Sequence, residues 1–484
     1  MNFFGIFKDI VNFIFVINIF LAILVILFER RNAASTWTWL MIMFFMPIVG
    51  FILYLFIGQD LRKQKFFYYK KEEEENLISI IKAQKNLLLN DYIVKSNNFL
   101  SQYHEFIKLN LTTNNAIFTH NNDIQLLNNG DEKFPKLIDS LNSAEKFIHM
   151  QYYIFNNDNI GNEILNILIK KAKEGVEVKL LYDGMGCIKL PKKFFQPLID
   201  AGGSVACFFP PFIPYINLRV NYRNHRKICT IDGVHGFIGG LNIGDEYLGL
   251  SKKFGFWRDI HLYITGDAVD SLETRFLLDW RFAAKEDISM EPKYFPKRNH
   301  IGYKGVQIIS SGPDSQWGAI RNAYLKMINS ADKNIYIETP YLVPDDSILT
   351  ALKIASLSGI DVRIIIPSRP DHPFVYWASK SYVWELMEAG VKCYIYDKGF
   401  IHSKMIAIDG KICSIGTANW DMRSFNLNFE VNAMIYDEKT TLEVEKTFLN
   451  DIKVSTFLTE TNMKSRSFIE KVKESVSRLL SPVL

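Results

Sequence analysis

The chain has 484 residues and carries 56 Lys and Arg against 52 Asp and Glu, a formal net charge of only +4. This balance argues against a nucleic-acid-binding protein that relies on a large positive field. The length predicts more than one folding unit, and a hydrophobic content of 48% is high for a soluble chain.

Two apolar segments predict a transmembrane hairpin within residues 1–60. Residues 10–28 and 37–57 carry no charged side chain, and each is long enough to cross the ~30 Å core of a bilayer as a helix. A buried core helix or a cleaved signal peptide is the alternative. The second segment is followed by a cluster of cations, Arg62, Lys63, Lys65, Lys70 and Lys71. The positive-inside tendency then predicts a multi-pass protein whose remaining domains are cytoplasmic.

Beyond a helical connector at 61–112, strand and helix patterns alternate, and they occur twice. The stretch "AEKFIHMQYYIF" from Ala144 is matched by "ADKNIYIETPYL" from Ala331, and further matches lie 177 to 187 residues apart. These offsets indicate one duplicated α/β unit with a mixed or parallel sheet covered by helices. We expect domains at 113–300 and 301–460 and a C-terminal tail at 461–484.

Each copy carries the motif H-x-K-x4-D. The first copy has His225, Lys227 and Asp232, and the second has His402, Lys404 and Asp409. Because side chains alternate along a strand, the histidine and the lysine of each copy project to the same face. If the copies pack about a pseudo-twofold axis, two imidazoles and two ammonium groups meet in one cleft.

Such a site suits a phosphodiester. The lysines hold the phosphate oxygens, one neutral histidine attacks phosphorus, and the other histidine protonates the departing alkoxide. The near symmetry of the motifs does not decide which histidine does which. A metal site is disfavoured because lysine is a poor ligand, and we expect no metal and no cofactor.

Several repeated polar residues are candidates for supporting roles. Asn242 in "GGLN" and Asn419 in "GTAN" are predicted neutral phosphate donors, as is a small hydroxyl residue beside them. Asp259 and Glu430 align and are predicted to accept a proton from a histidine Nδ1. Two questions stay open: whether the motif aspartates touch substrate or only support strand and loop, and whether His372 edges the cleft.

These motifs resemble the phospholipase D superfamily. The stretches "NYRNHRKI", "FWRDIHL", "SGPD" (311–314), "GFIHSKMIAIDG" and "GTANWDMRSFNLNFE" are similar to bacterial cardiolipin synthases, as is the two-span N-terminus. The resemblance implies two phospholipase D-type α/β sandwich domains forming a pseudo-twofold cleft in a bacterial plasma-membrane enzyme. It also implies that two phosphatidylglycerol molecules become cardiolipin and glycerol through a covalent phosphatidyl-histidine.

The resemblance further implies residue roles. His225 would be the nucleophile, His402 the general acid and base, and the acids at 259 and 430 would pair with the histidines across the halves. A lipid-hydrolysing phospholipase D, a nuclease and a non-catalytic membrane scaffold are the alternatives. Phosphatidylglycerol and anionic membrane lipids are the expected partners and nucleic acid is not, while the sequence does not predict an oligomeric state.

Two apolar stretches outside the motifs suggest lipid contacts. In the tail, Ile469, Val472, Val476, Leu479 and Leu480 fall at helical spacing. The predicted helix either lies on anionic lipid or docks on its own domain, and both alternatives stay open. In "FFPPFIPYINL", before the first motif, Phe208 and Phe212 are predicted to belong to a lipid-facing lip.

Overall fold

The computed structural model describes residues 13, 15–23, 33–46, 49–50, 54, 66–90, 98–210 and 222–481. The chain divides into a small unit, Met1–Lys65 with Pro210–Tyr222, and a large unit, Phe66–Phe209 with Arg223–Leu484. Both H-x-K motifs belong to the large unit.

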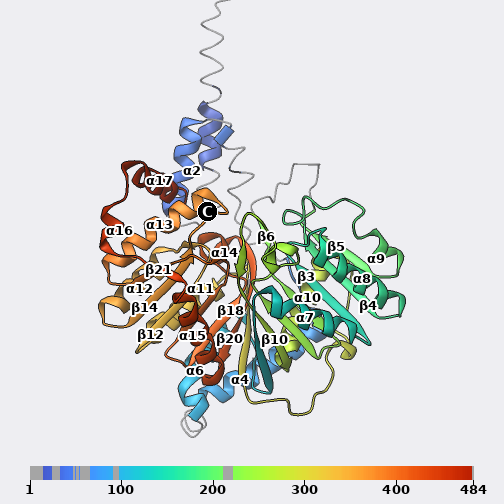
Figure 1. The fold of residues 1–484 in the computed structure, drawn as a ribbon. Helices are drawn as coiled ribbons and strands as arrows, with labels where there is room; N and C mark the ends of the chain where they lie inside the picture. Colours follow the sequence, from blue (N-terminus) through green and yellow to red (C-terminus); the bar gives the residue numbers. More distant parts are fainter. Residues whose placement is uncertain are drawn as a thin grey trace, which may run out of the picture. The chain divides into compact units, whose positions relative to one another are not determined.

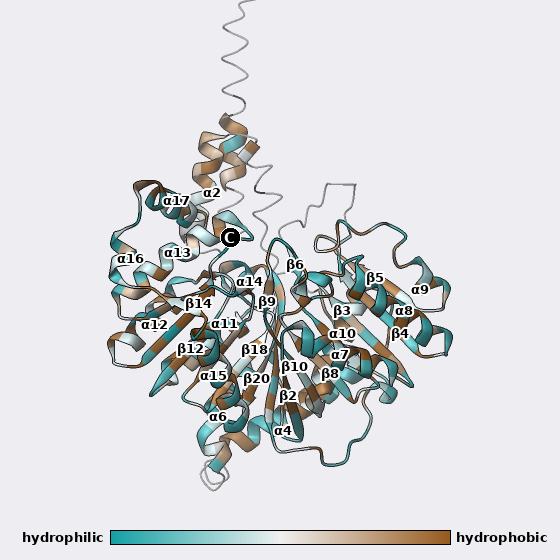
Figure 2. Cartoon of the chain, in the orientation of Figure 1, coloured by the Kyte–Doolittle hydropathy of each residue, from teal (hydrophilic) through white to brown (hydrophobic). Residues whose placement is uncertain are grey.

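In the small unit, α2 (Ala33–Phe45) is predominantly apolar (Figure 2). Its residues Trp39 and Met43 pack with Tyr54 into a small buried cluster. Among the described residues, no helix is both long and apolar enough to cross a membrane. Much of both expected spans, 10–28 and 37–57, lies outside the described residues, so the hairpin stays a prediction.

The first half of the large unit is built on a seven-stranded sheet with the order β2-β10-β8-β7-β3-β4-β5. The strands are β2 (Asn122–Asn128), β3 (Phe147–Tyr152), β4 (Glu177–Asp183), β5 (Ser204–Phe208), β7 (Ile228–Ile231), β8 (His235–Gly239) and β10 (Ile260–Gly266). The helices are α7 (Asn129–Asn142), α8 (Asn159–Lys173), α9 (Gln196–Asp200) and α10 (Ala268–Ala284).

The second half repeats this sheet and extends it at both edges, in the order β1-β11-β20-β18-β17-β12-β14-β15-β21. Its strands are β1 (Phe118–Thr119), β11 (Gly305–Ser311), β12 (Asn334–Glu338), β14 (Asp361–Pro367), β15 (Lys392–Tyr396), β17 (Met405–Ile408), β18 (Ile412–Gly416), β20 (Asn428–Tyr436) and β21 (Ser455–Phe457). Its helices are α11 (Ala319–Ser330), α12 (Asp346–Leu357), α13 (Pro373–Glu388), α14 (Met422–Asn426) and α15 (Glu438–Ile452).

The path from β11 to β15 matches the path from β2 to β5 strand for strand, which confirms the duplication. In each half three strands are parallel, β3-β4-β5 and β12-β14-β15, and the others are antiparallel. The sheets are therefore mixed, as predicted. Figure 1 shows the two halves side by side, and α10 and α15 contribute side chains to the apolar core between them.

The two sheets share one apolar core. Ile228, Ile238 and Leu262 of the first half lie in the same buried cluster as Met405 and Val431 of the second half. Because burial of apolar area is the main favourable term in folding, this cluster holds the halves together as one body. The motif strands β7 and β17 thereby come to lie on either side of the joint.

The connector contacts both halves, because its helices pack into the core of the second half while Glu73 pairs with Arg281 of α10 in the first half. Its helices α4 (Lys71–Leu89) and α6 (Asn98–Asn114) bury Ile81 and Ile107 against the α11 side of the second half. Residues 118–119 form β1, which pairs with β11. This short strand, which follows the start expected for the first domain at 113, thus adds to the sheet of the second half, because the outer edge of β11 offers unpaired backbone groups.

The tail forms two helices, α16 (Glu460–Lys464) and α17 (Phe468–Leu479). The helix α17 packs on α13, so docking on its own domain is confirmed (Figure 1). The prediction of a lip at Phe208 is wrong, since Phe208 is fully buried among Phe282 and Phe429. Phe212 lies outside the described residues.

Candidate active site

Short parallel strand pairs cross between the halves directly before the motifs. The strand β6 (Arg223–Asn224) precedes His225 and pairs with β20 of the second half. The strand β16 (Gly399–Ile401) precedes the second motif and pairs with β9 (Phe256–Arg258) of the first half. The histidine N–H groups continue these ladders, from His225 to Phe429 O at 2.9 Å and from His402 to Arg258 O at 2.7 Å. Each motif is thereby held against the segment of the other half that carries the acid.

The crossing places each histidine beside the acid of the opposite half. His225 Nδ1 lies 2.9 Å from Glu430 Oε2, and His402 Nδ1 lies 3.0 Å from Asp259 Oδ2. Both carboxylates are fully buried, whereas the histidine side chains keep 11% and 10% of their surface exposed. A carboxylate at Nδ1 favours the tautomer that has its proton there and leaves Nε2 free.

The two lysines are buried beneath the histidines. Lys227 Nζ donates to the carbonyl of His225 at 2.7 Å, and Lys404 Nζ donates to the carbonyl of His402. Lys404 Nζ also lies 2.7 Å from His402 Nδ1. Burial lowers the pKa of Lys227 to about 7 and that of Lys404 to about 8.

Burial and the nearby cations lower the pKa of both histidines. For His225 the pKa falls well below its usual value, with Lys227 and Lys404 adding to the effect of burial. For His402 burial and Lys404 lower the pKa to about 4, although the Asp259 and Asp371 charges oppose this. Both imidazoles are therefore neutral at neutral pH before an anion enters.

The two acids are held differently. Glu430 accepts hydrogen bonds from Thr417 Oγ1 at 2.5 Å and Asn428 Nδ2 at 3.2 Å, and burial raises its pKa to about 7. The first-half equivalent of Thr417 is Gly240, where a Cβ would lie 2.1 Å from Asp259 Oδ1. The Thr417 hydroxyl, predicted as a phosphate donor, is hydrogen-bonded to the acid in this structure.

The motif aspartates form hairpin turns at the far ends of β7 and β17. Asp232 and Asp409 both have φ of 54°, a left-handed conformation that aspartate tolerates. Asp232 accepts backbone N–H bonds from residues 145, 146 and 147, each at 2.8 Å, and Asp409 accepts three equivalent bonds at 2.8 to 3.0 Å. Seven residues of extended chain separate each from its histidine, on the order of 20 Å. The structure favours the alternative that they support strand and loop.

The two asparagines differ in their surroundings. Asn242 is engaged, because its Oδ1 accepts from Ile154 N at 3.1 Å and its Nδ2 donates to Tyr247 Oη at 3.2 Å. Asn419 is also buried, but its Oδ1 has no hydrogen-bond partner. Of the two asparagines predicted to be phosphate donors, Asn242 uses its side-chain amide in hydrogen bonds to neighbouring residues of the first half.

Several site residues were not predicted. The Tyr153 ring packs edge-on against His225 at 5.0 Å, and the Trp257 ring lies 5.1 Å from His402. The charge of Asp371 raises the pKa of His402 and of Lys404. The adjacent His372, in contrast, is 67% exposed and precedes α13. Tyr153, Trp257 and Asp371 have no counterpart in the other half of the sequence, so the repeated spacing of the motifs did not predict them.

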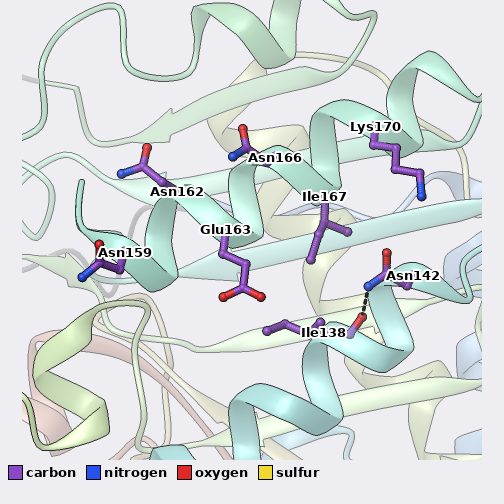
Figure 3. A pocket seen from close by; sticks show the side chains of 8 residues that line it. All are labelled: Ile138, Asn142, Asn159, Asn162, Glu163, Asn166, Ile167 and Lys170. Carbon is purple, nitrogen blue, oxygen red and sulfur yellow. Dashed lines mark hydrogen bonds between the residues drawn. The ribbon is translucent and has the colours of Figure 1, made fainter.

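A separate groove of about 610 Å³ lies between α7 and α8 (Figure 3). It is lined mainly by polar side chains, Asn142, Asn159, Asn162, Glu163, Asn166 and Lys170, with Ile138 and Ile167. None of the predicted site residues lines it.

Among the described residues, no group of three His, Cys, Asp or Glu side chains is placed to hold a metal ion.

Two H-x-K strands, each with its acid supplied by the other half, define a duplicated site of phospholipase D type. The family described as "Cardiolipin synthase, PLD-like domain" matches residues 137–268 and 324–452, one segment in each half. "Phospholipase_D-nuclease N-terminal" matches residues 16–59.

Curated relatives extend this match to almost the whole chain. A cardiolipin synthase of Staphylococcus aureus is 49% identical over 471 residues, 97% of this chain and 95% of that protein. The major cardiolipin synthase ClsA of Bacillus subtilis is 47% identical over 476 residues, 98% of this chain and 99% of that protein. The chain belongs to the cardiolipin synthase family of phospholipase D-like proteins.

A solved structure supports the fold. The crystal structure of phosphatidylserine synthase from Haemophilus influenzae aligns with a TM-score of 0.61 at 16% identity. The alignment covers 78% of this chain and 100% of that chain. At this identity the likeness concerns the fold alone.

Proposed function

We propose that the protein is a cardiolipin synthase that transfers a phosphatidyl group from one phosphatidylglycerol to another, giving cardiolipin and glycerol. The observation that carries the proposal is the pair of histidines at 225 and 402, each with Nδ1 at hydrogen-bond distance from a buried acid of the other half. The near full-length identity to cardiolipin synthases supports the choice of lipid.

In the first step, His225 Nε2 attacks phosphorus and forms a phosphatidyl-histidine. The bond from phosphorus to the glycerol headgroup oxygen breaks, and His402 gives that oxygen a proton. The ammonium groups of Lys227 and Lys404 offset the negative charge that grows on the phosphoryl oxygens.

In the second step, the neutral His402 takes a proton from a headgroup hydroxyl of the second phosphatidylglycerol. The oxygen attacks phosphorus, the nitrogen–phosphorus bond breaks, and cardiolipin leaves. One phosphodiester replaces another, so the reaction needs no nucleotide.

The surroundings of the histidines support this division of roles. The charges of two acids, Asp259 and Asp371, favour a proton on the His402 ring. At His225, burial and the cations Lys227 and Lys404 lower the pKa although Glu430 lies at Nδ1. An anionic phosphodiester arriving between the two histidines raises the pKa of His402 toward protonation.

We further propose that residues 10–28 and 37–57 span the bacterial plasma membrane as a hairpin, with both α/β halves in the cytoplasm. The match of residues 16–59 to an N-terminal region of phospholipase D-type proteins supports a distinct N-terminal segment. A diacyl lipid does not readily leave a bilayer, so a tether would keep the site at its substrate.

The test follows labelled phosphatidylglycerol in mixed micelles with the full-length protein, His225→Ala, His402→Ala and the exposed control His300→Ala. We expect cardiolipin and glycerol from the wild type and the control, and neither product from the two site variants. Phosphatidic acid as the only lipid product would make the protein a hydrolase, and no turnover at all would favour the scaffold.

A second substrate tests the roles of the two histidines. A phosphatidyl ester of p-nitrophenol has a leaving group that needs no proton. We expect His402→Ala to retain a burst of p-nitrophenol and to hold the lipid on the protein after denaturation in alkaline detergent, which preserves a nitrogen–phosphorus bond, whereas His225→Ala does neither. A burst in His225→Ala would reverse the assignment.

A further inference from the structure

The C-terminal helix α17 docks on the protein through polar residues. Its buried side chains are Glu474 and Ser477. Trp384 Nε1 of α13 donates to Glu474 Oε1 at 2.8 Å, and Arg466 Nη1 lies 2.7 Å from Glu474 Oε2. The docked face is therefore held by the hydrogen bond from Trp384 and by the ion pair of Arg478 with Glu385 of α13, whereas a surface helix usually docks through its apolar face.

The apolar face of α17 points to solvent. At about 100° per residue, its apolar residues fall on one side of the helix, opposite Glu474 and Ser477. The exposed fractions are Phe468 81%, Ile469 65%, Val472 43%, Val476 49%, Leu479 82% and Leu480 38%. A continuous apolar strip of this size marks an interaction surface.

Cations border this strip, and acids do not. By the same helical spacing Lys473 lies beside Leu480 at one edge and Lys471 lies beyond Ser475 at the other, and both lysines are exposed. The acids of the helix are engaged elsewhere, because Glu470 accepts the backbone N–H of Ser467 and Glu474 is paired with Arg466. An apolar strip with lysines along its margins matches the interface of an anionic bilayer.

The helix that supports α17 also contacts the backbone beside Asn419, because Ser379 of α13 accepts a hydrogen bond from Leu342 N and Leu342 pairs with Trp420. The residues just before α13 include Asp371, whose charge acts on His402 and Lys404. Phe374, in the first turn of α13, is 55% exposed. Figure 1 shows α17 lying along α13, and Lys473 Nζ sits 5.1 Å from the Trp377 ring centre.

We propose that the exposed face of α17, defined by Phe468, Ile469, Val472, Val476, Leu479 and Leu480, lies in the headgroup region of an anionic lipid bilayer. In this position the helix holds the border of the histidine site at the lipid surface. The evidence for the lipid contact comes from α17 alone. Its effect on turnover rests on the proposed function.

The contact is tested by photo-crosslinking of the full-length protein in vesicles that contain phosphatidylglycerol. The probe p-benzoylphenylalanine is placed at Val472 or, as the matched control, at Leu442 of α15, which is 56% exposed. We expect lipid adducts at 472 and none at 442. An adduct from 472 to the chain's own N-terminal residues, an adduct to a second copy, or no lipid adduct would overturn the proposal. This readout needs no turnover, so it stands even if the protein proves not to be a synthase.

The consequence is tested with the double variant Val472→Asn/Val476→Asn beside Leu442→Gln. We expect the double variant to raise the KM for phosphatidylglycerol in vesicles by about tenfold, as lost burial of two apolar side chains predicts. Activity on dispersed short-chain phosphatidylglycerol should be unchanged. Equal losses on both substrates, or an unchanged KM in vesicles, would contradict the role in presenting the site to lipid.

Discussion

At the residue scale, the two histidines have identical motifs but different neighbours. Thr417 and Asn428 support the acid beside His225, while a glycine at 240 leaves room for the acid beside His402. The difference affects proton affinity more than position, because both Nδ1 distances are about the same. Unequal proton affinity suits a pair in which one histidine attacks and the other carries a proton.

Replacing either acid by its amide should slow turnover without preventing binding. In Asp259→Asn or Glu430→Gln, the amide no longer selects the Nδ1-protonated tautomer or stabilises the imidazolium, so kcat should fall about 10²–10⁴-fold with little change in KM. Steady-state kinetics in micelles measure this, with the exposed Glu163→Gln on α8 as control. A kcat within twofold of the wild type would remove both acids from the proposed mechanism.

The pH dependence of kcat/KM should report the two lysines of the free enzyme. Below pKa values of about 7 and 8, Lys227 and Lys404 are charged and attract the phosphodiester, and this attraction is lost as pH rises through those values. We therefore expect kcat/KM to decline above pH 7 to 8. Lys404→Arg, which stays charged, should move the decline to higher pH, and an unmoved alkaline limb would contradict the assignment.

At the element scale, the last residue of each motif belongs to the hairpin that follows the strand. Asp232 between β7 and β8 and Asp409 between β17 and β18 each tie the start of a parallel strand to the turn. The repetition of H-x-K-x4-D therefore combines a reacting pair with a structural residue. The repeated spacing alone did not distinguish the reacting His and Lys from the structural Asp.

Removal of a turn aspartate should lower stability more than activity. In Asp409→Ala three backbone N–H groups lose a charged acceptor, which should cost about 2–4 kcal/mol of unfolding free energy. Thermal unfolding in detergent measures the loss, with the exposed Asp346→Ala as control. The activity per folded molecule should stay within a factor of two, and a specific loss of kcat would return Asp409 to the reacting group.

At the scale of the whole molecule, the middle residue of the first motif joins the two halves. Arg226 Nη1 lies 2.7 Å from Asp279 Oδ1 of α10, while its Nη2 donates to Ser311 O and its Nε to Glu430 O of the second half. The position between His225 and Lys227 points away from them, as strand alternation predicts. The same short motif thus serves the site on one face and the joint on the other.

The Asp279→Asn substitution should weaken this joint. It leaves the buried Arg226 charge unpaired, which should cost about 3–5 kcal/mol. The double variant Arg226→Met/Asp279→Leu should recover most of the loss, since two apolar side chains replace the pair. Denaturant midpoints compare the three proteins. A double variant no more stable than Asp279→Asn would show that the ion pair is not the source of the effect.

The sequence by itself determined the duplication, the mixed α/β sheets and the histidines, lysines and acids that meet. Strand alternation and a repeated spacing encode these features locally, so they can be read without coordinates. The resemblance implied that each histidine pairs with the acid of the other half, and the tertiary structure supplied the contact itself, between residues 205 positions apart for His225 and Glu430 and 143 apart for His402 and Asp259. Only the tertiary structure decided that Thr417 donates to an acid and that α17 turns its apolar face outward. These contacts depend on how two sheets and a tail pack together, which the pattern within any one segment does not contain.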